Sequence, residues 1–383
     1  MNFEFFMPAR LIFGPGKVKE VGVNAKSLGK KTLIVTGKSS AKKAGYLDVV
    51  TKSLEQEQID WILFDEVEPN PITTTVERGA KLARENSVEF VIGLGGGSAM
   101  DTAKGIAFAA LNEGPVSDYI AGKPGGDALP IALITTTAGT GSEANNYAVF
   151  TNPDTKVKKS LKSPRTYARF SIIDPELMLT VPKKVTASTG IDVFFHAMEA
   201  YVGRRSQPFT DALALEAMRL VVENLRGACE HGGDIRYRER MAWANTLAGV
   251  AINLSGTCGI HGMGHPLSGI YNVPHGESLA AVSLAFMRFN IPEAPGKFAK
   301  VAEVLGVDVR GLTLMEAAEK SVEALKDLMD SVGVPRSISA FGITEKDIDE
   351  LAEHAFKWMT HNLEVSPKVP TLEDVKKIYR ESL

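Results

Sequence analysis

The chain has 383 residues, of which 44% are hydrophobic and 23% charged, and its formal net charge is −3. This length suits two domains with sizeable cores, and the small net charge gives no electrostatic basis for binding nucleic acid or an anionic membrane surface. No apolar run approaches the length of a membrane span, residues 1–6 do not read as a signal peptide, and two cysteines make no disulfide framework. We therefore expect a cytoplasmic protein that binds neither nucleic acid nor membrane.

The first half of the chain alternates short apolar runs with helical stretches. Four runs have the composition of buried parallel strands: residues 31–37, 61–65, 90–95 and 129–135. Residues 73–86 carry helical spacing, and residues 3–13 suggest one more strand or a hairpin before a turn at 14–16. The alternation predicts an α/β domain with a mostly parallel sheet over residues 1–182.

Three turns at the ends of these predicted strands are rich in small polar residues or glycine. Residues 95–97 are three glycines before an expected helix, a combination that exposes backbone N–H groups to a phosphate. The alternative is an ordinary strand-to-helix turn, with Ser98 as N-cap and Asp101 closing a capping box. Residues 37–40 and 135–143 are the other two turns, at strand ends where an open α/β sheet places its ligand. Together the three turns fit a dinucleotide.

Helical periodicity dominates the second half of the chain. Residues 211–225, 236–254 and 312–332 carry it clearly, and strand-like runs become rare after residue 182. We expect an all-helical domain over residues 183–383, packed against the first domain with a cleft between them.

Four of the seven histidines gather in this second half near one aspartate. Asp192 and His196 are four residues apart, as are His261 and His265, so a helix would direct each pair to one side. His275 is the histidine of a Pro-His-Gly sequence further along the chain. Imidazoles with one carboxylate suit Fe(II) or Zn(II) and leave room for a substrate oxygen. The alternative is a set of satisfied core histidines, but the residues between His261 and His265 are small or apolar and offer few polar partners.

With these motifs in this order and spacing, the chain resembles the iron-containing (group III) alcohol dehydrogenases over essentially its full length, in the branch of lactaldehyde reductase, propanediol dehydrogenase and butanol dehydrogenase. Three motifs carry the resemblance: residues 95–101, residues 136–143, and residues 261–265 leading to 274–276. The resemblance implies a dinucleotide-binding α/β domain and a helical metal-binding domain, the architecture of dehydroquinate synthase, with the active site in the cleft between them. The implied activity is hydride transfer between NAD(P) and a small alcohol or diol, or its aldehyde or ketone.

The resemblance also implies roles for individual residues. The implied metal ligands are Asp192, His196, His261 and His275. The implied metal is Fe(II), with Zn(II) as the alternative. His265 falls on the histidine beside the substrate and nicotinamide, and Cys258 is expected to be a buried small hydrophobe and not a ligand. The candidate cofactor contacts are Gly37, Lys38, Ser39, Asn70, Gly96, Gly97, Ser98, Asp101, Thr136, Thr137, Thr140, Asn145 and Lys158.

Gly37 bears on the choice of cofactor. NAD-selective relatives of this type carry an aspartate here, which accepts hydrogen bonds from the ribose hydroxyls and repels a 2′-phosphate. In this chain Lys38 and two serines follow the glycine, so a phosphate would meet hydrogen-bond donors and no carboxylate. We expect NADP to be preferred, with NAD as the alternative. If Gly37 merely ends a strand, it carries no information about the cofactor.

Other functions remain open from the sequence. A metal-dependent lyase of the dehydroquinate synthase type would need basic residues for a phosphorylated, carboxylated substrate, yet residues 187–203 and 261–275 contain no Lys or Arg. A glycerol dehydrogenase-like oxidation of polyols is closer in chemistry. A regulatory metal- or nucleotide-binding protein would be expected to lack a ligand or the glycine turn, and neither is missing.

The apolar residues near the N-terminus predict an interface. Residues 3–6 and 11–13 suggest an edge strand that pairs across a twofold axis, and the resemblance implies a homodimer formed by the same route. The alternative is a hairpin within one chain.

Overall fold

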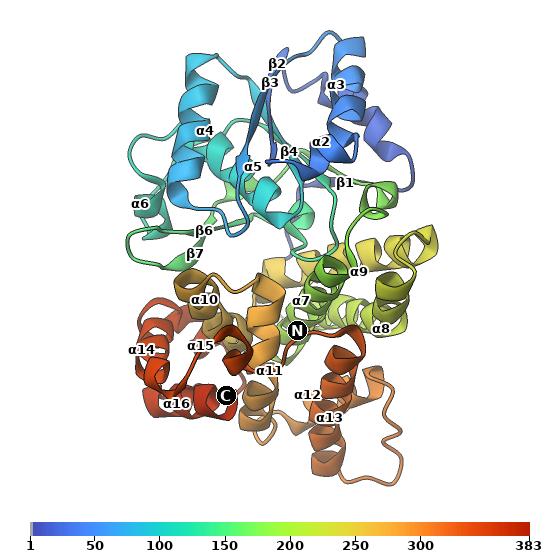
Figure 1. Cartoon of the computed structure of the whole chain (residues 1–383), viewed down its shortest axis with the longest axis vertical. Helices are drawn as coiled ribbons and strands as arrows, with labels where there is room; N and C mark the ends of the chain where they lie inside the picture. Colours follow the sequence, from blue (N-terminus) through green and yellow to red (C-terminus); the bar gives the residue numbers. More distant parts are fainter. Residues whose placement is uncertain (1–2) are drawn as a thin grey trace. The chain divides into compact units, whose positions relative to one another are not determined.

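The computed structural model describes residues 3–383, and these fall into two compact units (Figure 1). One unit is Glu4–Val181, and the other is Pro182–Leu383, with which Phe3 also groups. Residues 1 and 2, which begin the stretch inspected for a targeting signal, lie outside the described residues. Between residues 3 and 383, no helix is both long enough and apolar enough to cross a membrane.

The first unit is built on a six-stranded sheet in the order β1-β8-β5-β4-β2-β3, and every neighbouring pair is parallel. Strands β1 to β5 and β8 are Arg10–Phe13, Lys31–Gly37, Asp60–Val67, Phe90–Gly95, Ile131–Thr135 and Phe170–Ile173. Apolar runs form the central strands because both faces of a parallel sheet are covered. The predicted α/β class with a mostly parallel sheet is confirmed.

Helices cover both faces of this sheet (Figure 1). Helices α1 to α6 are Val21–Ala25, Ser40–Lys43, Tyr46–Gln56, Thr73–Glu85, Gly97–Ala109 and Val116–Ile120. Alternate residues of a strand point to opposite faces. Leu33 and Val35 of β2 therefore join a core with α4 and α5, while Ile34 between them joins a core with α1 and α3. The sheet thus separates two hydrophobic cores.

Two parts of the first unit differ from the sequence-based prediction. The additional strand expected within residues 3–13 is present as β1, which pairs in parallel with β8 at the sheet edge. It begins only at Arg10, residues 3–9 have no regular secondary structure, and the hairpin alternative is wrong. The structure also contains an antiparallel pair, β6 (Tyr147–Thr151) and β7 (Lys158–Lys162). The sequence did not indicate β7 because its residues, Lys-Lys-Ser-Leu-Lys, lack the apolar run used to find the other strands.

All regular structure of the second unit is helical, as predicted. Helices α7 to α16 are Lys183–Val202, Pro208–Glu230, Ile235–Ser255, Gly259–Tyr271, His275–Asn290, Pro295–Val304, Leu314–Val332, Ile348–Trp358, Thr360–Glu364 and Leu372–Glu381. The predicted helical segments correspond to α8, α9 and α13. Helix α13 starts at Leu314 because Thr313 and Glu316 form a capping box, each side chain accepting a hydrogen bond from the other's backbone N–H.

Helix α7 lies at the centre of the second unit. Nearly all of its residues beyond the first turn are buried, and it packs against α8, α9 and α11. A helix that is apolar on all sides is expected to be enclosed in this way. The polar residues on α7 are therefore held in a dry interior, where each of them needs a partner.

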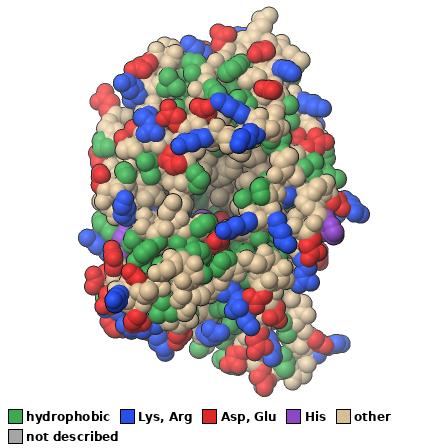
Figure 2. All heavy atoms as spheres, viewed as in Figure 1, with side chains coloured by type: hydrophobic (Ala, Val, Ile, Leu, Met, Phe, Trp, Pro, Cys, Tyr) green, Lys and Arg blue, Asp and Glu red, His purple; other side chains and the backbone are tan. Residues whose placement is uncertain are grey.

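Most charged side chains lie on the outside of the chain, and the exceptions include Asp101, Lys104 and Glu199. On the face in view in Figure 2, Lys and Arg side chains alternate with Asp and Glu side chains over both units. This mixture agrees with the net charge of −3 and is typical of a solvated surface.

Candidate functional site

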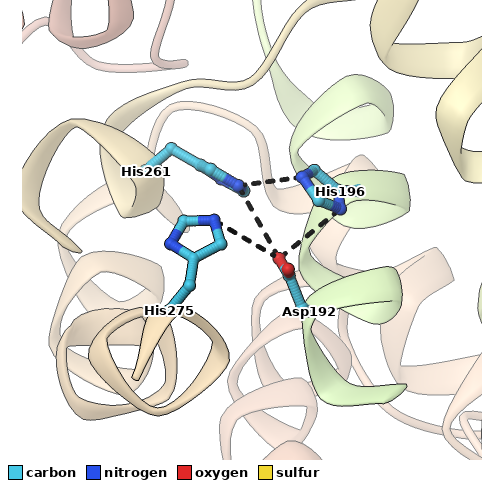
Figure 3. A group of neighbouring side chains, drawn as sticks. All are labelled: Asp192, His196, His261 and His275. Carbon is cyan, nitrogen blue, oxygen red and sulfur yellow. Dashed lines mark hydrogen bonds and ion pairs between the residues drawn. The ribbon is translucent and has the colours of Figure 1, made fainter. Parts of the chain in front are cut away.

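Four side chains from three helices of the second unit converge on one point (Figure 3). Asp192 and His196 lie one turn apart on α7, His261 lies in the first turn of α10, and His275 is the first residue of α11. One candidate ligand atom from each residue lies within 4.8 Å of those of the others. Asp192 Oδ1 faces all three rings, at 3.4 Å from His196 Nδ1, 3.8 Å from His261 Nε2 and 3.9 Å from His275 Nε2.

These separations fit the spacing of ligand atoms around a divalent metal. A tetrahedral ion with bonds of about 2.1 Å holds its ligand atoms about 3.4 Å apart. The distances from Asp192 Oδ1 to the ring nitrogens are 3.4 to 3.9 Å, longer than ordinary hydrogen bonds, and His196 Nε2 lies 3.0 Å from His261 Nε2. The chemistry of the donor set, three imidazoles and one carboxylate, suits Fe(II) or Zn(II).

The four side chains differ in their exposure. The side chains of Asp192, His196 and His261 are at most 7% exposed, whereas the side chain of His275 is 22% exposed. One side of the cluster is therefore open to a small molecule, while the other side is dry. A catalytic metal site needs such an open position in addition to its protein ligands.

Glycines allow the three helices to approach closely enough to form this cluster. A Cβ on Gly276 would lie 1.9 Å from the Ser188 carbonyl oxygen of α7, so α11 begins directly against the α7 backbone. A Cβ on Gly264 would lie 2.5 Å from Leu279 of α11. Real Cβ atoms do not make such short contacts, so position 276 has room only for glycine, while a side chain at position 264 would have to displace the end of the Leu279 side chain.

His265 lies one turn beyond His261 on α10 and borders the cluster without belonging to the four-residue group. Its ring centre is 5.8 Å from that of His261 and 5.4 Å from that of His275, and the residue is 8% exposed. Sequence spacing alone does not distinguish His265 from His261. In the structure, His261 belongs to the group of candidate metal ligands and His265 does not.

Sequence reasoning missed Glu199, which follows Asp192 and His196 on the same face of α7. Its Oε2 contacts His261 Nδ1, and its Oε1 accepts hydrogen bonds from the backbone N–H groups of Cys258 at 2.9 Å and His261 at 3.2 Å. The spacing i, i+4, i+7 of an acid, a histidine and a second acid was the signal that would have found it. Glu199 is 1% exposed.

Cys258 lies beside this carboxylate and outside the group of candidate ligands. Burial raises the pKa of its thiol well above the usual range, and the Glu199 carboxylate raises this pKa further. A protonated thiol is a poor metal ligand. The buried position agrees with the expectation of a small hydrophobe, although the thiol also contacts a charged group.

The glycine turn of the first unit joins β4 to α5. Helix α5 begins at Gly97 with Gly96 as its N-cap, and this N-cap makes no side-chain hydrogen bond. The alternative considered for this turn, a capping box of Ser98 and Asp101, is therefore wrong. The helix starts earlier than the sequence suggested, and Asp101 faces the interior at 7% exposure.

The turn after β5 packs against this glycine turn. A Cβ on Gly96 would lie 2.8 Å from Thr137 Oγ1, and a Cβ on Gly97 would lie 2.3 Å from Thr140 Cγ2. The Thr136 N–H also donates to the Gly95 carbonyl at 3.0 Å. The structure thus brings together two of the turns that the sequence predicted for the cofactor, at the start of a helix whose first N–H groups favour a phosphate.

Buried polar groups hold the second turn in place. The Asp101 carboxylate accepts a hydrogen bond from Ser142 Oγ at 2.6 Å and another from the Val149 N–H at 2.9 Å. Lys104 is 0% exposed and its Nζ donates to Ser142 and Asn145, at 2.7 Å and 3.0 Å from their carbonyl oxygens. Burial lowers the pKa of Lys104 to about 8, although Asp101 opposes this shift. The Asn145 side-chain amide donates to the Gly141 carbonyl at 2.9 Å, so this amide and the Asp101 carboxylate both hold the turn through hydrogen bonds within the protein.

The remaining candidate cofactor residues lie at the same end of the sheet. Lys158 Nζ donates to Asn70 Oδ1 at 2.8 Å, so these two residues from distant parts of the sequence lie together. Gly37 ends β2, with Lys38 and Ser39 exposed just beyond it. Because β2, β4 and β5 are neighbouring parallel strands, the turns that follow them share one sheet edge.

A nucleotide- and metal-dependent oxidoreductase needs two kinds of site. One is a set of polar turns at the carboxyl ends of parallel strands, and the other is a cluster of metal ligands, here three histidines and one aspartate. Residues 8–175 match the family model described as iron-containing alcohol dehydrogenase. Residues 186–383 match the model described as the C-terminal part of the Fe-containing alcohol dehydrogenase family. The chain belongs to the iron-containing alcohol dehydrogenase family.

Individual relatives agree with this assignment. The chain is 38% identical to the 1,3-propanediol dehydrogenase of Citrobacter freundii over 99% of this chain and 98% of that protein. It is 36% identical to the NAD-dependent methanol dehydrogenase of Bacillus methanolicus over 99% of both. Among solved structures, a 1,3-propanediol oxidoreductase is similar with a TM-score of 0.95 and 37% identity over 100% of both chains.

The family assignment defines the class of reaction. The chain is an alcohol dehydrogenase, which transfers a hydride between a nicotinamide cofactor and an alcohol or its carbonyl product. The lyase alternative is not favoured, because both parts of the chain match the alcohol dehydrogenase family.

Proposed function

We propose that this dehydrogenase acts on a small neutral alcohol or diol, or on the corresponding aldehyde or ketone, at a metal held by Asp192, His196, His261 and His275. The convergence of these four side chains carries the proposal. The neutral substrate is supported by residues 187–203 and 261–275, which include all four ligands and contain no Lys or Arg. The names of the propanediol and methanol dehydrogenases to which the chain is similar agree with a short substrate.

Fe(II) is the proposed metal, with Zn(II) as the alternative, since this donor set accepts both and the family is iron-containing. When bound, the metal supplies a Lewis acid that polarises the substrate oxygen. The chain's own residues hold three neutral rings and one carboxylate in a fixed array and keep water away from its buried side. The cofactor turns of the first unit would bind the dinucleotide that carries the hydride.

His265 is proposed to face the substrate and nicotinamide and to pass the alcohol proton toward solvent. Its place beside His261 and His275, outside the four-residue group, supports this role. An imidazole exchanges protons near neutral pH, as such a relay requires. The alternative role is to orient the nicotinamide or substrate without proton transfer.

NADP is proposed as the preferred cofactor, with NAD as the alternative that the NAD-dependent methanol dehydrogenase suggests. The support comes from the turn after β2. A Cβ on Gly37 would find its nearest neighbour, the Val67 carbonyl oxygen, 3.7 Å away, so packing does not require glycine there. The missing carboxylate, with Lys38 beside it, leaves space and positive charge for a 2′-phosphate.

A homodimer is proposed through the edge of the first unit's sheet. Strand β1 occupies that edge, and Phe5 and Phe6 beside it are 38% and 58% exposed. An exposed strand edge with apolar side chains is a template for pairing with a second copy. Light scattering is expected to give twice the chain mass of 41.2 kDa at micromolar concentration. A mass of one chain throughout would contradict the dimer.

The proposed reaction is tested by absorbance at the reduced-nicotinamide band. Metal-free protein is reloaded anaerobically with Fe(II) or Zn(II) and given short alcohols and diols with NAD or NADP. Cofactor reduction is expected to require the metal, to stop on chelation and to return when metal is restored. His261→Ala should abolish metal retention, whereas His231→Ala, outside the cluster, should not. No reduction across the whole panel with either metal would contradict the proposed function.

The cofactor preference is tested by Gly37→Asp. The new carboxylate should bond the ribose hydroxyls and repel a 2′-phosphate, moving the NADP/NAD ratio of kcat/KM toward NAD by about tenfold or more, the equivalent of one charge-assisted hydrogen bond. Gly296→Asp in α12 is the matched control, because a Cβ there meets no neighbour within 4 Å. An unchanged ratio in Gly37→Asp would show that this position does not set the preference.

The role of His265 is tested by His265→Ala. Loss of a proton relay should lower kcat by about 10²-fold and change its pH profile, while the metal content stays at the wild-type level. Metal content and kcat are measured on the same preparation. Loss of metal would instead make His265 a ligand, and a normal pH profile with reduced kcat would favour the orienting role.

A further inference from the structure

Glu199 meets three nitrogen donors that all belong to the start of α10, and the Cys258 thiol also contacts it. Its Oε1 receives the backbone N–H groups of Cys258 and His261, and its Oε2 contacts the Nδ1 of the His261 ring. An ionised carboxylate can only accept hydrogen bonds, so the His261 Nδ1 must carry the proton. The Nε2 of the same ring then keeps its lone pair, and this is the atom that faces the other proposed ligands, at 3.0 Å from His196 Nε2 and 3.8 Å from Asp192 Oδ1.

From these contacts we propose that Glu199 is a positioning residue of the metal centre, which fixes the tautomer and orientation of His261 so that Nε2 is presented to the metal. The inference rests on the proposed metal ligands. A carboxylate on the outer nitrogen of a ligating histidine fixes the ring and makes it a stronger donor. Glu199 stands in that position relative to His261.

The same carboxylate also fixes where α10 begins. Cys258 is the N-cap of α10 and His261 is its third residue, so Glu199 satisfies two of the N–H groups that a helix leaves unpaired at its start. A negative charge at this end of a helix is favourable. Helix α7 therefore carries two proposed ligands itself and, through Glu199, sets both the backbone and the ring of a third.

The charge of Glu199 matches the charge of a divalent ion. Its side chain is 0% exposed, and within the described part of the chain its one ion-pair contact is with His261. A buried carboxylate without a cationic partner is costly. Three neutral imidazoles, Asp192 and Glu199 together balance a metal of charge +2, whereas the other buried glutamate nearby, Glu277, contacts Lys184 at 3.6 Å.

A glutamine at position 199 could not satisfy all three donors. If its amide oxygen accepted the two backbone N–H groups, its NH₂ group would face Nδ1 and favour the tautomer with the proton on Nε2. If the oxygen faced Nδ1 instead, the NH₂ group would oppose two N–H donors. The isosteric change Glu199→Gln therefore tests the carboxylate itself at nearly constant volume.

The experiment measures the dissociation constants of Zn(II) and Co(II) by chelator competition for the wild type, Glu199→Gln and Tyr379→Phe. Tyr379 is the matched control, because its hydroxyl donates to the Met263 carbonyl of α10 at 2.7 Å and is fully buried, yet it contacts no ligand ring. Metal-free melting temperatures and the d–d spectrum of bound Co(II) are recorded for each protein. These readouts do not depend on turnover.

Glu199→Gln is expected to weaken metal binding by about 10- to 100-fold and to alter the Co(II) spectrum. Tyr379→Phe should lower the melting temperature but leave metal affinity within about threefold and the spectrum unchanged, since the ring of His261 keeps its partner. Equal weakening in both variants, or wild-type affinity in Glu199→Gln, would overturn the inference. A wild type that binds no metal would instead overturn the proposed function.

Glu199→Asp covers the case in which Glu199→Gln does not fold. Aspartate keeps the buried charge but withdraws the oxygens from Nδ1 by one methylene group. Weaker metal binding with a metal-free protein that remains folded supports the role in orienting His261. Unchanged affinity in Glu199→Asp contradicts it.

Discussion

The structure depends on one carboxylate facing three imidazole rings that come from three helices. Asp192 Oδ1 lies within 3.9 Å of a nitrogen of each ring, and no two of the helices alone could form the group. Helix α7 must be enclosed on all sides for this, and glycines must stand where α10 and α11 come closest to their neighbours. Much of the unusual composition of the segments around His261 and His275 follows from that constraint.

In both units, buried charged side chains hold a segment of backbone in place. In the first unit, Lys104 and Asp101 form hydrogen bonds with the turn after β5, and the glycine turn packs against that turn. In the second unit, Glu199 accepts hydrogen bonds from the start of α10. Such groups are costly to bury, so they fix geometry at the expense of stability, as pre-organised binding sites require. For hydride transfer, distance and angle are what the protein contributes.

The sequence predicted those features that follow from a repeating physical pattern. Strands such as Lys31–Gly37 and Phe90–Gly95 carry continuous apolar runs because both faces of the sheet are covered, and Asp192 with His196 shows the spacing of one helix face. The metal cluster could be predicted because the spacing of its residues is visible in the sequence. The one further condition was that the separate helices lie together in the fold.

Features that depend on tertiary contacts were not predictable in this way. Strand β7 is rich in lysine, and its pairing with β6 does not appear in an apolar pattern. Asp101 looked like a helix cap, but its partners, Ser142 and Val149, are more than 40 residues away in the chain. Glu199 had the right spacing, yet only the structure shows that its partner is on another helix.

If Asp192, His196, His261 and His275 surround one metal ion, X-ray absorption at the metal edge of the Fe(II)- or Zn(II)-loaded protein will show it. Nitrogen and oxygen neighbours are expected at about 2.0–2.2 Å, with the outer-shell scattering of three imidazoles. A sulfur neighbour at about 2.3 Å, which would place Cys258 on the metal, or scattering from fewer than three imidazoles would contradict that arrangement.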